Sequence, residues 1–320
     1  RQRQMCIRDS PLSDGGTFSG VQDLVMKYGV VPAEVFPESY NANNTSKMAE
    51  IISLKLRQYG LELRDMVSKG KSATDLQKRK TTMLGEVYHI LQICLGTPVE
   101  KFVWTLRTAD GKAVSTAEYT PKQFYQEFVG KDLKNDYVML MNDPTRPYYK
   151  LYAVDLDRHT YDGRNWTYIN LPMSEIKAMA VKSLKDTTMM YMSCDVGKFL
   201  DKKTGVLDVD NYDYASLFNT TFPMNKAERI QTHASASSHA MTLMAVGLDA
   251  TGKTTKWMVE NSWGPTYGYK GHLIMTDKWL DEYLFRLVVD KKYVDAKTLD
   301  ILNQKPTLLP AWDPLFQAEQ

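Results

Sequence analysis

Two stretches of the sequence decide the fold: residues 237–247, SSHAMTLMAVG, and residues 256–264, KWMVENSWG. Each contains an apolar run with the character of a β-strand, and residues 249–252, DATG, form a turn signal between them. We therefore predict two antiparallel strands joined by a hairpin. His239 opens the first run and Asn261 follows the second. A hairpin would bring these two side chains to the same end of the strand pair.

A histidine and an asparagine in this arrangement can act together in general-base catalysis. Histidine is a useful general base because its unperturbed pKa is about 6.5. An asparagine oxygen can accept a ring N–H and fix the tautomer without adding charge, which suits a thiolate–imidazolium pair. Trp263 lies close enough in the sequence to cover this hydrogen bond. A lone histidine on an apolar strand is usually structural, and Asn-Ser-Trp-Gly alone could be a turn, but the combination favours catalysis.

The remaining sequence predicts an α+β fold, helical in its first half and rich in antiparallel strands in its second half. Apolar spacing and capping signals predict helices over residues 21–28, 45–67, 76–96, 120–130, 174–184 and 277–285. Short apolar runs predict strands over residues 99–103, 149–156, 187–194, 272–276 and 286–290, with a hairpin turn at Asp110-Gly111.

Composition excludes several classes of function. Of the 320 residues, 43% are hydrophobic and the net charge is +2, which is ordinary for a soluble globular protein. No apolar run approaches the ~20 residues of a membrane-spanning helix, so we expect no membrane partner. The densest basic run, residues 69–80, lacks interleaved aromatic residues and reads as a solvated helix end, so nucleic acid is not an expected partner. Cys6, Cys94 and Cys194 show neither metal-ligand spacing nor a disulfide framework, so we expect no metal, no cofactor and a cytoplasmic location.

Several further segments narrow the class of protein. Beside the histidine and asparagine stretches they are SDGG (13–16), KYGVVPAEVFPES (27–39), SCDVGKFLDKKTGVLD (193–208), NKAER (225–229) and LPAWDP (309–314). Together these segments resemble the papain-like cysteine peptidases of the bleomycin hydrolase / aminopeptidase C family. The resemblance covers almost the whole chain after the first ten residues.

The resemblance implies a papain-like fold and a thiol aminopeptidase that hydrolyses peptides at their free amino termini, commonly as a homohexamer. His239 would be the general base, Asn261 its orienting partner, and Trp263 their shield. Gly15 and Gly16 would line the substrate cleft. The C-terminal arm would lie in the cleft, with the carboxylate of Gln320 near the substrate ammonium. Phe316 is bulkier than the small residues expected in that arm.

We accordingly divide the chain into four parts. Residues 1–10, RQRQMCIRDS, are polar and unpatterned and read as a non-native leader. Residues 11–147 form a mainly helical part, residues 148–305 a β-rich part that carries His239 and Asn261, and residues 306–320 the C-terminal arm.

The sequence departs from the family at the nucleophile. The family carries a Cys-Gly-x-Cys-Trp stretch, preceded by a glutamine, upstream of its Asp-Gly-Gly segment, and neither is present here. Cys6 lies in the leader, Cys94 is expected to pack in a helical core, and Cys194 is expected to be structural. We therefore expect a fragment that lacks the catalytic cysteine and is inactive as written. The alternative is a non-catalytic homologue that acts as an oligomeric or nucleic-acid-binding scaffold.

Overall fold

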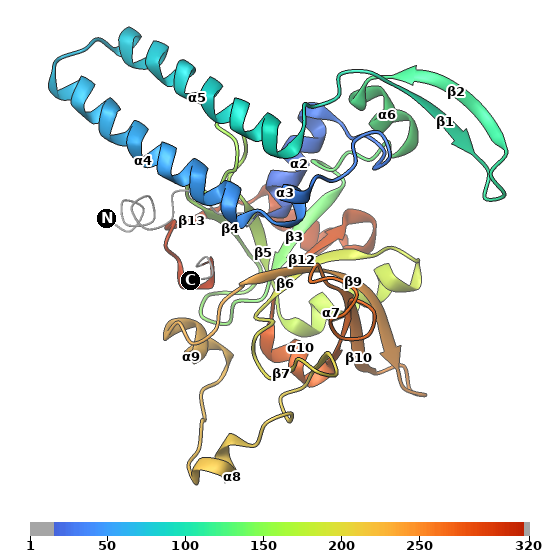
Figure 1. Ribbon diagram of the computed structural model, residues 1–320. Coiled ribbons are helices and arrows are strands. Elements are labelled where there is room, and N and C mark those ends of the chain that lie inside the picture. Colours follow the sequence, from blue (N-terminus) through green and yellow to red (C-terminus); the bar gives the residue numbers. More distant parts are fainter. Residues whose placement is uncertain (1–15, 317–320) are drawn as a thin grey trace. The chain divides into compact units, whose positions relative to one another are not determined.

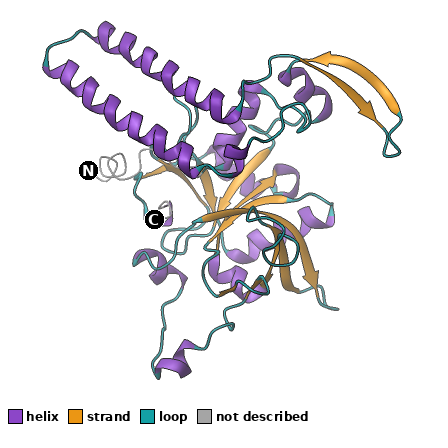
Figure 2. Ribbon diagram, in the orientation of Figure 1, coloured by secondary structure: helices purple, strands orange, loops and turns teal. Residues whose placement is uncertain are grey.

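The computed structural model describes residues 16–316, and the chain forms two compact units. Of the described residues, the first unit contains 16, 17 and 24–131. The second contains residues 18–23 and the chain from Asp132 onward. Helices and strands occur in both units (Figure 2), which confirms the predicted α+β class. The predicted boundary at residue 147 falls inside the second unit.

Two long antiparallel helices, α4 (Ser46–Ser68) and α5 (Ala73–Leu95), lie side by side in the first unit (Figure 1). Ser72 begins α5 with a capping box, in which its hydroxyl accepts from the N–H of Asp75 and the Asp75 side chain accepts from the N–H of Ser72. Across the pair, the guanidinium of Arg79 binds both oxygens of Glu62, with Nη2 and Oε2 2.9 Å apart.

Few side chains of this helix pair are buried, and this corrects one prediction. The buried residues of α4 are Ile52, Ser53 and Tyr59, and Met83 is the buried residue of α5. Cys94 was predicted to pack in a core but is only partly buried. A pair of helices can cover only one side of each other, so the apolar residues on their remaining faces stay accessible.

The first unit also contains a β-hairpin, two shorter helices and the second half of a helix whose first residues, 18–23, belong to the second unit. Strands β1 (Phe102–Arg107) and β2 (Ala113–Tyr119) pair around the predicted turn, where Gly111 has a φ of 87°. Helix α6 (Pro121–Phe128) starts as expected, with a capping box at Thr120 and proline in its first turn. Helix α2 (Phe18–Tyr28) ends at Gly29, and α3 is the single turn Tyr40–Asn43.

An eleven-stranded sheet forms the second unit, with strand order β13-β4-β5-β3-β12-β6-β9-β10-β11-β8-β7 (Figure 1). Most neighbours are antiparallel, while β13 and β4, β3 and β5, and β8 and β11 are parallel pairs. The strands are β3 (Tyr137–Met141), β4 (Lys150–Val154), β5 (Thr167–Asn170), β6 (Met190–Cys194), β7 (Leu200–Asp201), β8 (Val206–Leu207), β9 (His239–Leu248), β10 (Thr254–Glu260), β11 (His272–Thr276), β12 (Leu284–Asp290) and β13 (Thr307–Leu309).

The core of this unit centres on β12. All seven of its residues are buried, including Arg286 and Asp290, and the strand is paired on both edges. Helix α7 (Met173–Lys185) packs against β12 and β9, and α10 (Asp277–Tyr283) packs against β10, β11 and β12. The indole N–H of Trp257 donates to Asp277 and that of Trp279 to the carbonyl of Lys198, so these buried tryptophans are satisfied.

Shorter elements complete the second unit: α8 (Tyr214–Phe218), α9 (Lys226–Gln231), η1 (Lys291–Tyr293), α11 (Ala296–Leu299), η2 (Asp300–Asn303) and η3 (Pro314–Phe316). Lys226, at the start of α9, is buried and its ammonium donates to the carbonyls of Asp281 and Leu284 at 3.0 and 2.6 Å. These bonds fix α9 to the end of α10. Among residues 16–316, no helix is both long enough and apolar enough to cross a lipid bilayer.

Candidate active site

The hairpin predicted from the two deciding stretches is present. Strands β9 and β10 pair antiparallel, and their turn spans Asp249–Lys253. The Asp249 carboxylate accepts from the N–H groups of Thr251 and Lys253 at 2.8 and 3.0 Å, and Gly252 has a φ of 85°. The Thr251 hydroxyl and these backbone donors hold the pKa of Asp249 below its ordinary value. Local turn chemistry therefore sets the first pair, Leu248 with Thr254, and the register then shifts between Thr254 and Lys256 and again between Met258 and Val259.

His239 and Asn261 meet at the open end of this hairpin. Nε2 of His239 lies 2.8 Å from Oδ1 of Asn261. The same oxygen accepts the backbone N–H of Ser262 at 2.8 Å. Because a backbone N–H can only donate, the atom at this position is the amide oxygen, and the His239 nitrogen facing it must carry a proton. The ring is thus held as the Nε2–H tautomer, which leaves Nδ1 as the nitrogen able to accept a proton.

Trp263 covers the side of the histidine. Its ring centroid lies 5.2 Å from that of His239, at an interplanar angle of 35°. The indole is partly buried against the main core of the second unit. Asn261 Nδ2 is also buried, and within residues 16–316 it finds no acceptor. The pair is therefore enclosed on the asparagine side, while the His239 side chain keeps partial exposure.

The loop after Trp263 is held by close backbone packing. Gly268 has a φ of 57°, and a Cβ at this position would come 2.3 Å from the carbonyl oxygen of His272. Tyr267 places its ring edge-on to Trp263, with centroids 5.8 Å apart. Glycine is required at position 268 because both the dihedral angle and the space exclude a side chain.

The described cysteines do not complete a catalytic pair. Cys194 lies opposite His239 in the β6–β9 register, but its side chain is fully buried. Burial, and next the charge of Asp195, raise the pKa of the Cys194 thiol well above its ordinary value, which disfavours the reactive thiolate. Cys94 is a partly buried residue of the first unit, and Cys6 lies outside the described residues.

Of the three predicted cleft residues, Gly16 lies within the described part of the chain. Gly15 and Gln320 lie outside the described residues. Gly16 is exposed, and a Cβ at this position would meet no atom within 4 Å. Phe316, which seemed too bulky for the arm, packs its ring on Tyr168 with centroids 5.0 Å apart.

Sequence reasoning missed three polar residues beside the histidine. Arg286, Ser193 and Ser237 are buried, and their side chains form hydrogen bonds with one another. One signal was available, namely an arginine within the otherwise apolar run LFRLVV. Such a residue is rarely buried unless it has specific partners.

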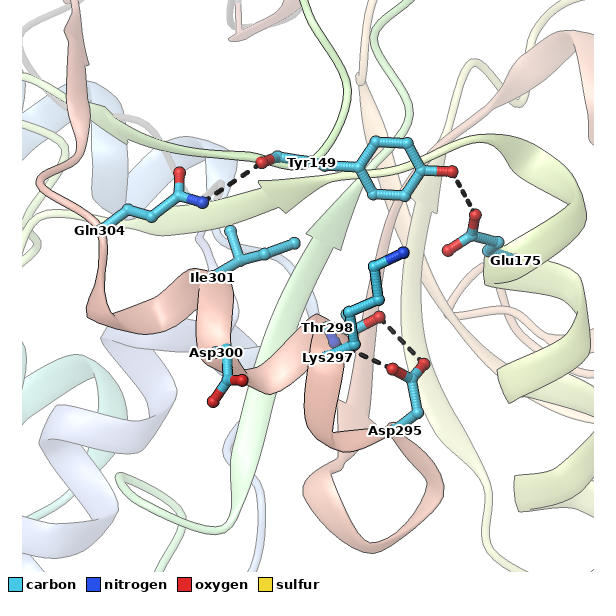
Figure 3. Close-up of a pocket in the computed structure, with 8 residues that line it drawn as sticks. All are labelled: Tyr149, Glu175, Asp295, Lys297, Thr298, Asp300, Ile301 and Gln304. Carbon is cyan, nitrogen blue, oxygen red and sulfur yellow. Dashed lines mark hydrogen bonds between the residues drawn. The ribbon is translucent and has the colours of Figure 1, made fainter.

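A separate cavity of about 360 Å³ lies elsewhere in the second unit (Figure 3). Its polar groups are engaged locally, since Tyr149 donates to Glu175 and Asp295 accepts from the hydroxyl of Thr298 at 2.9 Å. None of the predicted site residues lines it, so we do not assign it to the reaction. It is lined by Tyr149, Glu175, Asp295, Lys297, Thr298, Asp300, Ile301 and Gln304.

Comparisons with known proteins identify the family of the chain. The profile of the Peptidase C1-like family matches residues 1–316. Human bleomycin hydrolase is 40% identical over 314 residues, which span 96% of this chain and 69% of that protein. Aminopeptidase C of Streptococcus thermophilus is 36% identical over 97% of this chain and 70% of its own length. The crystal structure of PepW from Lactobacillus rhamnosis superposes with a TM-score of 0.92 at 37% identity, covering 98% of this chain and 71% of that one. The resemblance read from the motifs is thus confirmed: the chain belongs to the Peptidase C1-like family.

Proposed function

We propose that the chain supplies the base half of a thiol aminopeptidase, which hydrolyses peptide bonds at free amino termini. The observation that carries this proposal is the 2.8 Å bond between His239 and Asn261, with the tautomer fixed by the N–H of Ser262. His239 Nδ1 would take the proton of an attacking thiol and later return it to the leaving amine. The names of the relatives, bleomycin hydrolase and aminopeptidase C, support peptides as the substrate class.

We further propose that the attacking thiol is none of the described cysteines, and that these 320 residues alone are inactive. Cys194 is fully buried, and Cys94 lies in the first unit, whereas His239 lies in the second. Gly15, Gly16 and Gln320 remain our proposed substrate contacts, and a homo-oligomer in the cytoplasm remains the proposed setting.

An aminoacyl-coumarin substrate tests both statements. The purified 320-residue chain should release no coumarin above background, and turnover that His239→Ala abolishes would refute the claim of inactivity. In any form of the protein that carries an activated thiol, His239→Ala should lower kcat by about 10²–10⁴-fold. Asn261→Ala should also lower kcat, with little effect on KM, because the tautomer is no longer fixed. Unchanged kcat in both variants of an active form would reject His239 as the general base and Asn261 as its orienting partner.

A further inference from the structure

A chain of hydrogen bonds runs from Arg286 to the main chain of His239. Arg286 lies on β12, is 9% exposed, and its Nε lies 2.6 Å from Oγ of Ser237. Its Nη2 lies 3.2 Å from Oγ of Ser193, on the neighbouring strand β6. The two serine hydroxyls are 2.8 Å apart, and Ser193 Oγ lies 3.0 Å from the carbonyl oxygen of His239.

The donors in this chain can be arranged in only one order. Each serine has one hydroxyl proton, and a guanidinium can only donate. Ser193 must donate to the His239 carbonyl, because that oxygen can only accept. Ser237 must then donate to Ser193 and accept from Arg286. Every proton therefore points from the buried charge towards His239, and removal of any member leaves a buried group without its partner.

The surroundings of Arg286 are those of a positioning residue rather than of an ion pair. The guanidinium lies over the ring of Trp166 at 4.7 Å and near that of Phe316 at 5.6 Å, and it donates to the Tyr168 hydroxyl at 3.2 Å. Among residues 16–316 the hydrogen-bond partners of the guanidinium are all neutral, and Asp157 acts on it only through its charge. A buried cation bonded to neutral groups has a desolvation cost that an apolar residue in the same strand would avoid. No direct ion pair therefore explains the arginine.

The same residues also bind the C-terminal segment. The N–H of Ser237 donates to the carbonyl of Leu315 at 3.1 Å, and the Leu315 side chain is fully buried. Phe316 packs on both Tyr168 and the Arg286 guanidinium. Ser237 is thus bonded at its main chain to the C-terminal segment and at its side chain to the hydroxyl chain that ends on His239.

We propose that Arg286, acting through Ser237 and Ser193, positions the His239 imidazole, and that the packing of Leu315 and Phe316 against these residues affects the orientation of that imidazole. The Ser193 bond fixes the main chain from which the imidazole projects, and so sets the angle at which Nε2 meets Asn261. This inference rests on the proposed function, because only a catalytic imidazole needs a fixed orientation.

The test is nuclear magnetic resonance of the full chain with ¹⁵N-labelled histidine, which requires no turnover. The Nε2–H tautomer of His239, assigned with the His239→Ala variant, should dominate the wild-type spectrum. In Ser193→Ala its preference over the Nδ1–H form should fall by about threefold or more, as expected for the loss of one hydrogen bond. Ser237→Ala, which breaks the chain one step earlier, should act in the same direction and serves if Ser193→Ala does not fold. Phe316→Ala should produce a smaller change of the same sign.

Ser183→Ala is the matched control. Ser183 is equally buried in the same unit and its hydroxyl also donates to a main-chain carbonyl, that of Thr188, at 2.8 Å. It should cost similar stability and leave the His239 tautomer unchanged. A wild-type tautomer ratio in folded Ser193→Ala and Ser237→Ala, or an equal change in Ser183→Ala, overturns the proposal. Either result leaves the peptidase assignment standing, whereas the kinetic test of His239→Ala can reject His239 as the base without changing the tautomer ratio, so the two failures are distinguishable.

Discussion

Removal of the Arg146 side chain should destabilise the second unit more than removal of Asp313, one of its two partners. Nη2 of Arg146 binds both oxygens of Asp313, at 3.1 and 2.9 Å, and its Nε lies 2.5 Å from Oδ2 of Asp143. Both carboxylates are buried, with exposures of 0% for Asp143 and 4% for Asp313. Arg146→Ala leaves two buried negative charges without their cation, which should cost about 3–5 kcal/mol in the free energy of unfolding.

Asp313→Ala leaves a different balance of charge. The remaining Arg146–Asp143 pair is neutral overall, so the loss is that of charge-assisted hydrogen bonds, about 1.5–3 kcal/mol. Lys278→Ala is the control, because its ion pair with Asp210 has both side chains at least 66% exposed and should contribute about 0–1 kcal/mol.

Urea denaturation followed by tryptophan fluorescence measures these differences. Trp166, Trp257 and Trp279 are fully buried in the second unit and therefore report on its unfolding. The expected order of destabilisation is Arg146→Ala, then Asp313→Ala, then Lys278→Ala. If Arg146→Ala cost no more than Asp313→Ala, or no more than the control, the argument from uncompensated buried charge would be refuted.

Three further predictions follow from single side chains. Burial lowers the pKa of Lys226 to about 7, so the folded state favours the neutral amine. The free energy of unfolding of the wild type, relative to that of Lys226→Met, should be constant below about pH 7. Above that pH the difference should rise by about 1 kcal/mol per pH unit towards the ordinary lysine range. Denaturation between pH 6 and 9.5 measures this difference, and a constant value would contradict the prediction. Because burial raises the pKa of the Cys194 thiol, iodoacetamide at pH 8 should alkylate Cys194 only after unfolding, and mass spectrometry showing rapid native labelling would count against the buried assignment. Gly29 has a φ of 81°, and a Cβ would lie 2.3 Å from Pro121, so Gly29→Ala should lower the unfolding free energy by about 1–3 kcal/mol. Gly60→Ala, in a helix with open space around it, should instead stabilise by about 0.5–1 kcal/mol, and thermal unfolding that reverses this order would be evidence against the strain.

Much of the local structure could be predicted from the sequence. The capping signal at Thr120-Pro121, the turn at Asp110-Gly111 and the β9–β10 hairpin all formed where expected. Each depends on residues close together in the chain, whose hydrogen bonds and dihedral preferences act whatever the rest of the fold does. Boundaries were less exact, since the strand predicted over residues 99–103 is β1, Phe102–Arg107.

The contact between His239 and Asn261 was also within reach of the sequence. A hairpin brings residues near its open end together, so the spacing and the residue types predicted the contact, although not the two register shifts between the strands. The Arg286 network was not, because its members come from β12, β6 and the segment before β9. The burial of Cys94 was predicted wrongly for the same reason, because it depends on how much of α5 its neighbouring elements cover.

The sequence by itself determined the α+β class, the hairpin and the residue types that meet at its end, because these follow from interactions between near neighbours. Only the tertiary structure decided that Cys194 is fully buried although it lies opposite His239, and that Arg146 reaches the buried Asp313, 167 positions away. Burial and charge pairing depend on which distant segments come together, and no local pattern records that.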